Sequence, residues 1–212
     1  MSVVREGGFI ADVRGGVSRR HFVHGIFGTL LLAGFSPARA AMMEAREDAW
    51  VEQTRQIGMA LFAYASDNNE NYPDGRSSTA IFQTLLDGRY LSDPAVLLLP
   101  LPNKTEALAG QKLKPENVCF DVTCCLDISA PDLLPLVYMT GYKVTYKAGG
   151  SAIPVAKPPL SPGIAVMYKS NSSKFMRPSP GSTDGAIPNF IPPGVSLTKP
   201  YHQLTPDGTA PQ

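Results

Sequence analysis

The sequence predicts an α+β protein in which a long N-terminal helix packs on a small antiparallel β-sheet. Three observations predict this class. Residues 41–66 contain no proline and carry apolar side chains at helical spacing. Residues 138–147 and 163–169 alternate apolar and polar side chains, which is the period of a half-buried strand. The helical segments precede the strands instead of alternating with them, as is typical of α+β proteins.

The composition indicates one core surrounded by much irregular structure. The chain has 212 residues, enough for one domain and an appendage, and 43% of them are hydrophobic. Twenty prolines and nineteen glycines exceed average usage, so long stretches should be irregular. The formal net charge is +1, so no basic surface indicates a nucleic-acid partner.

Residues 1–40 have the layout of a secretory signal. Arginines precede an apolar run at 25–35, which is too short to cross about 30 Å of hydrocarbon as a helix. Small residues flank Arg39 at the two positions that a signal peptidase reads. The string SRRHFV at 18–23 resembles the twin-arginine export signal. We expect export to the periplasm or cell surface, with a general secretory signal or an uncleaved 25–35 membrane anchor as alternatives.

Residues 41–66 are predicted to form the long helix, because strong helix formers dominate them. Trp50, Ile57, Leu61 and Tyr64 fall on one helical stripe, which we expect to be the interaction face of the helix. We expect Trp50 to be half-exposed. Packing on the sheet of its own chain is favoured over a contact with the helix of a neighbouring subunit.

The polar run SDNNENYPDG at 66–75 should end this helix, since asparagine tolerates left-handed backbone and proline cannot continue a helix. Asp67, Asn69 and Asn71 also match the first three ligand positions of a calcium loop. The glycine and glutamate that such a loop requires are absent at Tyr72 and Ser78, so a helix stop is favoured. A second helix is predicted at 80–91, capped by a residue within 77–79 and ended near Gly88.

The strands predicted at 138–147 and 163–169 should pair antiparallel across a long connection at 148–162. Shorter strand candidates lie at 173–177 and 189–191. The proline-rich segment 178–212 is predicted to be coil packed loosely over the sheet, with its last ten residues disordered. Four tyrosines are assigned to the core and rim of the sheet in preference to a sugar-binding platform: Tyr138, Tyr142, Tyr146 and Tyr168.

Three cysteines, Cys119, Cys124 and Cys125, lie in the string CFDVTCC. An exported protein meets oxidising conditions, so a disulfide from Cys119 to Cys124 or Cys125 is predicted. A direct bond between Cys124 and Cys125 requires an eight-membered ring and is less favoured. Either pairing leaves one cysteine as a free thiol or an intermolecular link.

The sequence offers little for catalysis or cofactor binding. A serine nucleophile needs a general base, commonly histidine, and His202 is the only histidine in residues 41–212. A zinc site needs about four ligands, and no histidine is near the cysteines along the chain. We therefore predict no enzyme activity, no catalytic residue, no cofactor and no metal site.

Several segments resemble the prepilin-like, type II secretion pseudopilin-like proteins of the planctomycete–verrucomicrobial type. The most specific is QTRQIGMALFAYASDNNENYPDG at 53–75, where the family typically reads NLRQIGLALQMYAQDNNGRFP. LLDGRYLSDPAVLLLP follows the family pattern L..YL.DP.VF.CP, and LPLVYMTGYKVTYKAGG and PGIAVMYKSNSSKF resemble its sheet. The resemblance covers residues 53–175. The matching positions of the first segment are Arg55, Gln56, Ile57, Gly58, Ala60, Leu61, Tyr64, Ala65, Asp67, Asn68, Asn69, Tyr72 and Pro73.

The resemblance implies a long helix laid against a small antiparallel sheet, without catalysis. It also implies subunits that pack through their helices into a periplasmic or surface filament for secretion, adhesion or DNA uptake. The prepilin processing site is not matched, because Val13 stands where its glutamate belongs. We expect an exported pilin-like protein with parts at 1–40, 41–177 and 178–212, whose partners are pilin-like or secretion subunits. The alternative is a periplasmic module that binds a glycan or peptide.

Overall fold

The computed structural model describes residues 19–108, 110–156 and 162–208, with only the backbone of residues 19–37. The chain divides into two compact units, residues 1–42 and 43–212. In the first unit the helix α1 (Arg19–Asp67) begins, and the described side chains at 38–42 are exposed. Most of the predicted export segment 1–40 therefore lies outside the described side chains. In the part of the chain described here, no helix is long and apolar enough to span a membrane.

The long helix ends where the sequence predicts but begins earlier. It was expected at 41–66, and α1 runs from Arg19 to Asp67. The predicted start at Ala41 is wrong because it was placed at an expected processing site and not at a helix-breaking signal. The residues on either side of that site, Ala40 and Ala41, are both strong helix formers.

The asparagine run ends α1, as predicted. The Asn68 side chain donates a hydrogen bond to the carbonyl of Tyr64 at 2.8 Å, which satisfies an orphan carbonyl of the last turn. Asn69 and Glu70 then adopt left-handed backbone, with φ of 53° and 65°. Asp67 accepts a hydrogen bond from the Tyr90 hydroxyl at 3.1 Å, so its carboxylate also helps to hold the turn after the second helix.

The second helix is confirmed as α2 (Ser78–Asp87). The Ser77 side chain accepts a hydrogen bond from the backbone N–H of Ala80, which is a standard N-cap, and Gly88 is the C-cap. Ile81, Phe82 and Leu85 are buried on one side. Two short 3-10 helices follow, η1 (Pro94–Leu97) and η2 (Pro115–Asn117).

Antiparallel strands form a sheet of five, in the order β6-β5-β2-β1-β7, and a separate ribbon of two, β3-β4. The α+β class, with a long helix and a small antiparallel sheet, is therefore confirmed. The strands are β1 (Phe120–Thr123), β2 (Pro135–Met139), β3 (Tyr142–Val144), β4 (Ala152–Pro154), β5 (Ile164–Tyr168), β6 (Ser173–Met176) and β7 (Gln203–Leu204).

The predicted strand at 138–147 is in fact two strands in different sheets. Thr140 and Gly141 separate β2 from β3, and Gly141 has a φ of +98°, which breaks the extended path. The predicted pairing of 138–147 with 163–169 survives in β2 and β5, where Tyr138 lies opposite Val166. The half-buried pattern expected of β5 is wrong, since all its residues are buried.

The tail 178–212 is not a loose covering, and the prediction that its last ten residues are disordered is wrong for 203–208. Gln203 and Leu204 form β7 at the edge of the sheet, where Thr123 pairs with Gln203. The predicted strand at 189–191 is absent from the described structure, but Phe190 and Ile191 are fully buried. The prolines exclude long strands, yet the apolar side chains between them complete the core. Residues 209–212 lie outside the described chain.

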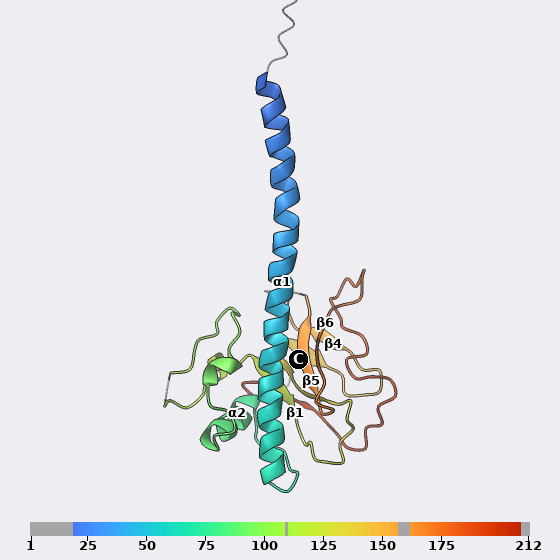
Figure 1. Cartoon of the computed structure of the whole chain (residues 1–212). Helices are drawn as coiled ribbons and strands as arrows, with labels where there is room; N and C mark the ends of the chain where they lie inside the picture. The colour runs from blue at the N-terminus through green and yellow to red at the C-terminus, as the bar shows by residue number, and fades with distance from the viewer. Residues whose placement is uncertain (1–18, 109, 157–161, 209–212) are drawn as a thin grey trace, which may run out of the picture. The chain divides into compact units, whose positions relative to one another are not determined.

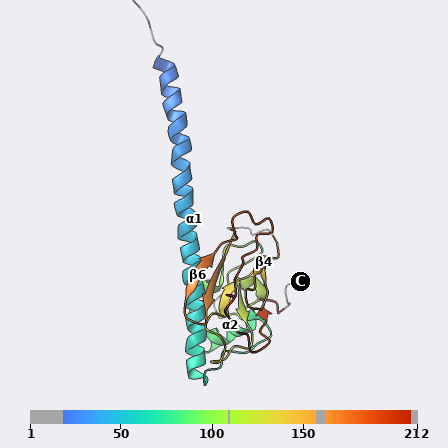
Figure 2. The same cartoon turned by 90° about the vertical axis from the view of Figure 1, so that its right-hand side faces the viewer.

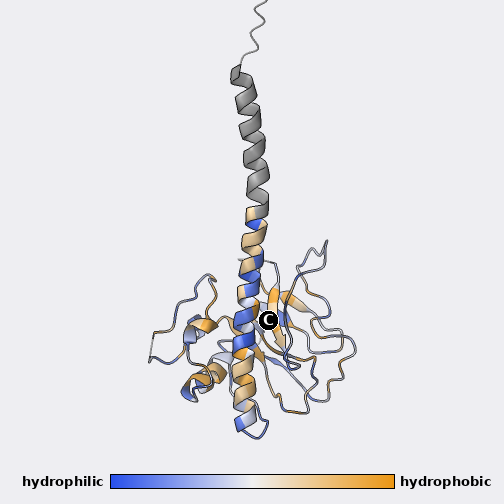
Figure 3. Ribbon diagram, viewed as in Figure 1, coloured by the Kyte–Doolittle hydropathy of each residue, from blue (hydrophilic) through white to orange (hydrophobic). Residues whose placement is uncertain are grey.

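Within the second unit, α1 lies against the sheet next to β6 in both views (Figure 1 and Figure 2). Gly58 faces β5 so closely that a Cβ there would lie 2.0 Å from the Met167 sulfur. Glu47 forms an ion pair with Arg177, just beyond the end of β6. Figure 3 shows hydrophilic and hydrophobic residues mixed along this part of α1. Ile57 and Leu61 are buried and Met59 is exposed, so the helix has a sheet-facing stripe and an exposed face.

Candidate functional site

The predicted interaction stripe of α1 is mostly occupied within the chain itself. Trp50 is only 3% exposed and its ring centroid lies 6.0 Å from that of Phe175 on β6. Ile57 and Leu61 are also buried, whereas Tyr64 is half-buried and packs edge-on against Tyr90 with centroids 5.3 Å apart. The expected packing of Trp50 on the sheet of its own chain is confirmed, whereas its expected partial exposure is wrong, because the Phe175 ring of β6 covers the indole.

The opposite face of α1 is exposed and borders a groove. A cavity of about 350 Å³ lies between this face and the segment Tyr90–Ser92. Met59 is 45% exposed at its wall, although methionine is usually buried. Glu52 accepts a hydrogen bond from Gln56 at 3.3 Å and lies 3.9 Å from Arg55. The charges beside Met59 thus pair along the helix and leave an apolar side chain exposed.

The four tyrosines lie in or against the core, as predicted. The hydroxyls of Tyr138 and Tyr146 are 2.9 Å apart, and Tyr146 also meets the Thr123 hydroxyl at 2.8 Å. Tyr142 donates to the Gly163 carbonyl and Tyr168 to the Phe190 carbonyl, at 2.8 and 3.0 Å. Their hydroxyls therefore hold loops to the sheet and do not form an exposed sugar platform.

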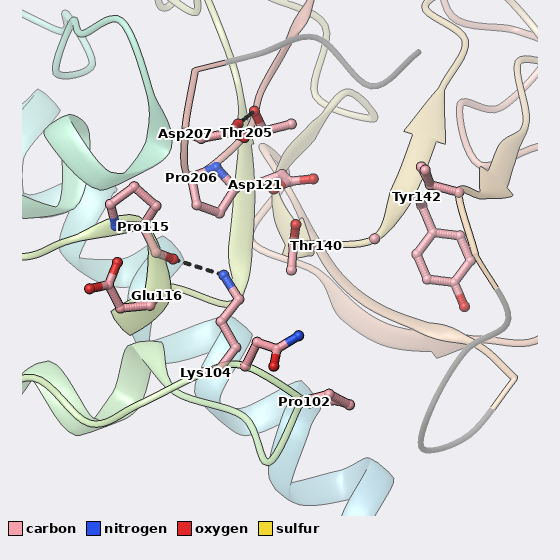
Figure 4. Close-up of a pocket in the computed structure, with 13 residues that line it drawn as sticks. Pro102, Lys104, Pro115, Glu116, Asp121, Thr140, Tyr142, Thr205, Pro206 and Asp207 are labelled. Atoms are coloured by element: carbon pink, nitrogen blue, oxygen red, sulfur yellow. Dashed lines mark hydrogen bonds between the residues drawn. The ribbon is translucent and has the colours of Figure 1, made fainter.

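A cavity of about 490 Å³ lies where the loop around Lys104 meets the end of β2 and the C-terminal tail (Figure 4). Of the four tyrosines, only Tyr142 lines it. The Lys104 ammonium donates hydrogen bonds to the carbonyls of Pro115 and Val118, at 2.8 and 2.5 Å. Its cation is therefore held by backbone oxygens at the wall of the cavity.

Asp121 is the most perturbed group at this cavity. Its side chain is fully buried, and its Oδ2 accepts a hydrogen bond from Gln203 at 2.6 Å. Its Oδ1 makes no hydrogen bond of normal geometry to any described residue. Burial raises the pKa of Asp121 from 3.8 to about 7, against the opposing effects of Gln203, Thr140 and Lys104. Sequence reasoning missed this residue, because a single aspartate in a short segment carries no local signal of burial.

The raised pKa of Asp121 predicts a stability that falls as the pH rises. The native carboxyl holds its proton up to about pH 7, whereas the unfolded one loses it near 3.8. The stabilisation by the protonated Asp121 carboxyl is present in full below about pH 3.8 and is lost as the pH rises through about 7. We expect the free energy of unfolding to decline by up to about 1.4 kcal/mol per pH unit within this window.

Asp121→Asn tests this dependence, because the amide has the same shape and cannot ionise. Urea unfolding should show that the variant loses the decline and exceeds the wild type in stability at about pH 8. Asp74→Asn is the control, since Asp74 is exposed. If the wild type and Asp121→Asn decline in parallel, the carboxyl of Asp121 ionises normally in the fold and the prediction fails.

The predicted disulfide from Cys119 is wrong, and all three cysteines are free thiols. Cys119 precedes β1 and Cys124 follows it, so about 16 Å of extended chain separates them. That separation is far beyond the 7 Å at which two Cα atoms can be bridged. The buried Cys119 thiol instead contacts the Leu99 carbonyl at 3.6 Å.

Cys124 and Cys125 lie beside His202, which the sequence separates widely from them. Their sulfurs are 2.9 Å apart, and the ligand atoms of all three residues lie within 4.8 Å of one another. Burial is the largest of the effects that raise the pKa of Cys124 to about 12, and the hydrogen bond and charge of Cys125 add to it. A histidine that is distant along the chain is therefore near these cysteines in space, because β1 pairs with β7.

Comparisons of the chain with protein-family models, with curated proteins and with solved structures find no match. The candidate sites therefore rest on their own geometry. They are the exposed face of α1, the cavity beside Asp121 and the cluster of Cys124, Cys125 and His202.

Proposed function

We propose that this protein is an exported, non-enzymatic pilin- or pseudopilin-like subunit that acts through contacts with other protein subunits. Its place would be the periplasm or cell surface, in a secretion-system or surface filament. The observation that carries the proposal is a long helix with two faces: one is docked on an antiparallel sheet, and the other is exposed. This is the arrangement that the resemblance of residues 53–175 implies.

The exposed face is the one available for subunit contacts, because the stripe containing Trp50, Ile57 and Leu61 is buried against its own sheet. Met59 offers an apolar contact at the groove beside Tyr90–Ser92. The exposed Ala63 borders the same groove, and its small side chain allows another helix to approach closely. We take a second copy of this chain as the partner, with Met59 as its central contact.

A binding module is the second candidate, and the cavity beside Asp121 supports it. A buried carboxyl, the Lys104 ammonium and the Tyr142 ring line the same space of about 490 Å³. Ligand sites commonly combine apolar walls with a few polar groups of perturbed pKa. The cavity suits a small polar ligand better than an extended glycan, because the other tyrosines turn into the core.

The exposed face of α1 is tested by self-association of the full-length chain. Sedimentation velocity over a concentration series should show reversible assembly of the wild type. Met59→Glu should raise the dissociation constant by about tenfold or more, because a charge would be buried at the contact. Thermal unfolding should be unchanged, because Met59 is exposed.

Leu108→Glu is the matched control, since it places the same charge at an exposed apolar residue away from α1. It should assemble as the wild type does. A wild-type chain that stays monomeric throughout, or an equal loss of assembly in both variants, would contradict the proposed contact.

A further inference from the structure

We propose that Cys124, Cys125 and His202 form a binding site for one thiophilic metal ion of the Zn²⁺ class. Two sulfurs and one imidazole converge there, with all ligand atoms within 4.8 Å of one another. The inference goes beyond the proposed subunit contacts and does not depend on them, because the cluster belongs to the segment after β1 and to the C-terminal tail and not to α1.

The sheet brings the three ligands together. Thr123, the last residue of β1, pairs with Gln203 of β7. One residue further, the backbone N–H of Cys124 donates a hydrogen bond to the carbonyl of His202 at 2.8 Å. The imidazole is therefore held opposite the two thiols by backbone pairing, so the site exists only once the tail has joined the sheet.

The donor set suits a soft or borderline metal. Thiolate and imidazole ligands are those that Zn²⁺ prefers, and two thiolates neutralise its charge. Three protein ligands leave a fourth tetrahedral position for water, as in sites with two cysteines and one histidine. Lys199 interacts electrostatically with Cys125 but is paired with Asp127, which offsets its repulsion of a metal ion.

Metal binding requires only a small rearrangement of the thiols. Zinc–sulfur bonds of about 2.3 Å at a tetrahedral angle hold two sulfurs about 3.8 Å apart. The sulfurs of Cys124 and Cys125 are 2.9 Å apart, so one of them must move outward. Cys125 is exposed, so rotation of its side chain can provide this movement without disturbing the core.

A direct disulfide between Cys124 and Cys125 is the competing outcome. It would release two protons and two electrons to an oxidant such as a small-molecule disulfide, and it would close an eight-membered ring. The disulfide does not involve His202, whereas the metal site does. Substitution of this histidine therefore separates the two outcomes.

The test uses the full-length chain, reduced with a phosphine and freed of metal with a chelator. Titration with Zn²⁺ against a chromophoric competitor should show one ion bound per chain. Cys125→Ser and His202→Ala should each weaken binding by about tenfold or more. Both residues are exposed, so these variants are expected to fold. Co²⁺ should give the thiolate charge-transfer and tetrahedral ligand-field bands of such a site, and both variants should lose them.

Cys119→Ala is the control, because it removes a thiol that lies outside the cluster; its Zn²⁺ affinity should match that of the wild type. Three results would overturn the assignment. One is the lack of stoichiometric binding by the reduced chain, and another is unchanged affinity in His202→Ala. The third is a 124–125 disulfide that re-forms in the presence of reductant and leaves no thiol for Zn²⁺.

Discussion

Phe190→Ala is expected to lower the free energy of unfolding by about 3–5 kcal/mol. Phe190 lies in the proline-rich tail, yet its side chain is fully buried. Its ring packs edge-on against Tyr138 of β2, with centroids 5.4 Å apart at an interplanar angle of 82°. Its carbonyl also accepts the hydrogen bond of the Tyr168 hydroxyl on β5. Truncation would leave a cavity between the tail and two central strands, which explains the size of the effect.

Urea unfolding followed by circular dichroism measures this loss as a lower midpoint at similar slope. Leu108→Ala is the matched control, because Leu108 is 64% exposed, and it should change stability by less than about 0.5 kcal/mol. If the two truncations cost the same, the tail is not part of the cooperative core. The dependence of the free energy of unfolding on urea concentration is informative as well. A shallower dependence in Phe190→Ala would show that the tail unfolds separately from the sheet.

Gln203→Met is expected to destabilise the protein by at least about 3 kcal/mol. The Gln203 amide donates to Asp121 Oδ2 at 2.6 Å and to the Tyr142 carbonyl at 2.7 Å. Its carbonyl oxygen accepts from the Val144 N–H at 3.0 Å. One buried side chain of β7 thus links β1 to β3. Methionine fills the same volume but leaves three buried polar groups without this partner, and each costs about 1–3 kcal/mol.

Gln111→Met makes the same chemical change at an exposed position and should be nearly neutral. Thermal and urea unfolding of the two variants, side by side, separate the loss of buried hydrogen bonds from any general effect of methionine. A loss below about 1 kcal/mol in Gln203→Met would mean that water replaces the amide. The bridge between the two sheets would then not be a main source of stability.

These two residues give the C-terminal tail a defined role. Phe190 and Gln203 attach the tail to the sheet by packing and by hydrogen bonds, respectively. His202 is the neighbour of Gln203, so the same attachment places the imidazole beside Cys124 and Cys125. We therefore expect Gln203→Met to weaken the proposed metal site as well as the fold.

The exposed face of α1 and the cluster of Cys124, Cys125 and His202 involve different residues and different parts of the fold. The proposed subunit contacts would require Met59 and its groove, and the proposed metal binding would require the edge of the sheet at β7. A variant that loses one property is expected to keep the other. The two proposals can therefore fail independently.

Local patterns in the sequence were sufficient for the end of α1, for α2 with a cap within 77–79, and for the helical stripe that contains Ile57 and Leu61. Each of these depends on residues within a few positions of one another, through helical spacing, capping or turn chemistry. The α+β class follows in the same way from the order of the periodic segments. The predicted antiparallel pairing of 138–147 with 163–169 is found only at its start, where Tyr138 lies opposite Val166. The alternating residues on which it rested begin at Tyr142, and β3 pairs with β4 instead.

Only the tertiary structure decided the sheet order, the burial of the tail and the location of the candidate sites. The four-residue strand β1 has no periodic pattern long enough to recognise, and β7 contains two residues. Both strands are stabilised by partners far along the chain, as in the pairing of Val122 with Leu204. The buried Asp121 carboxyl and the approach of His202 to the thiols depend on this pairing. Contacts between such distant segments have no local spacing, so only folding brings these groups together.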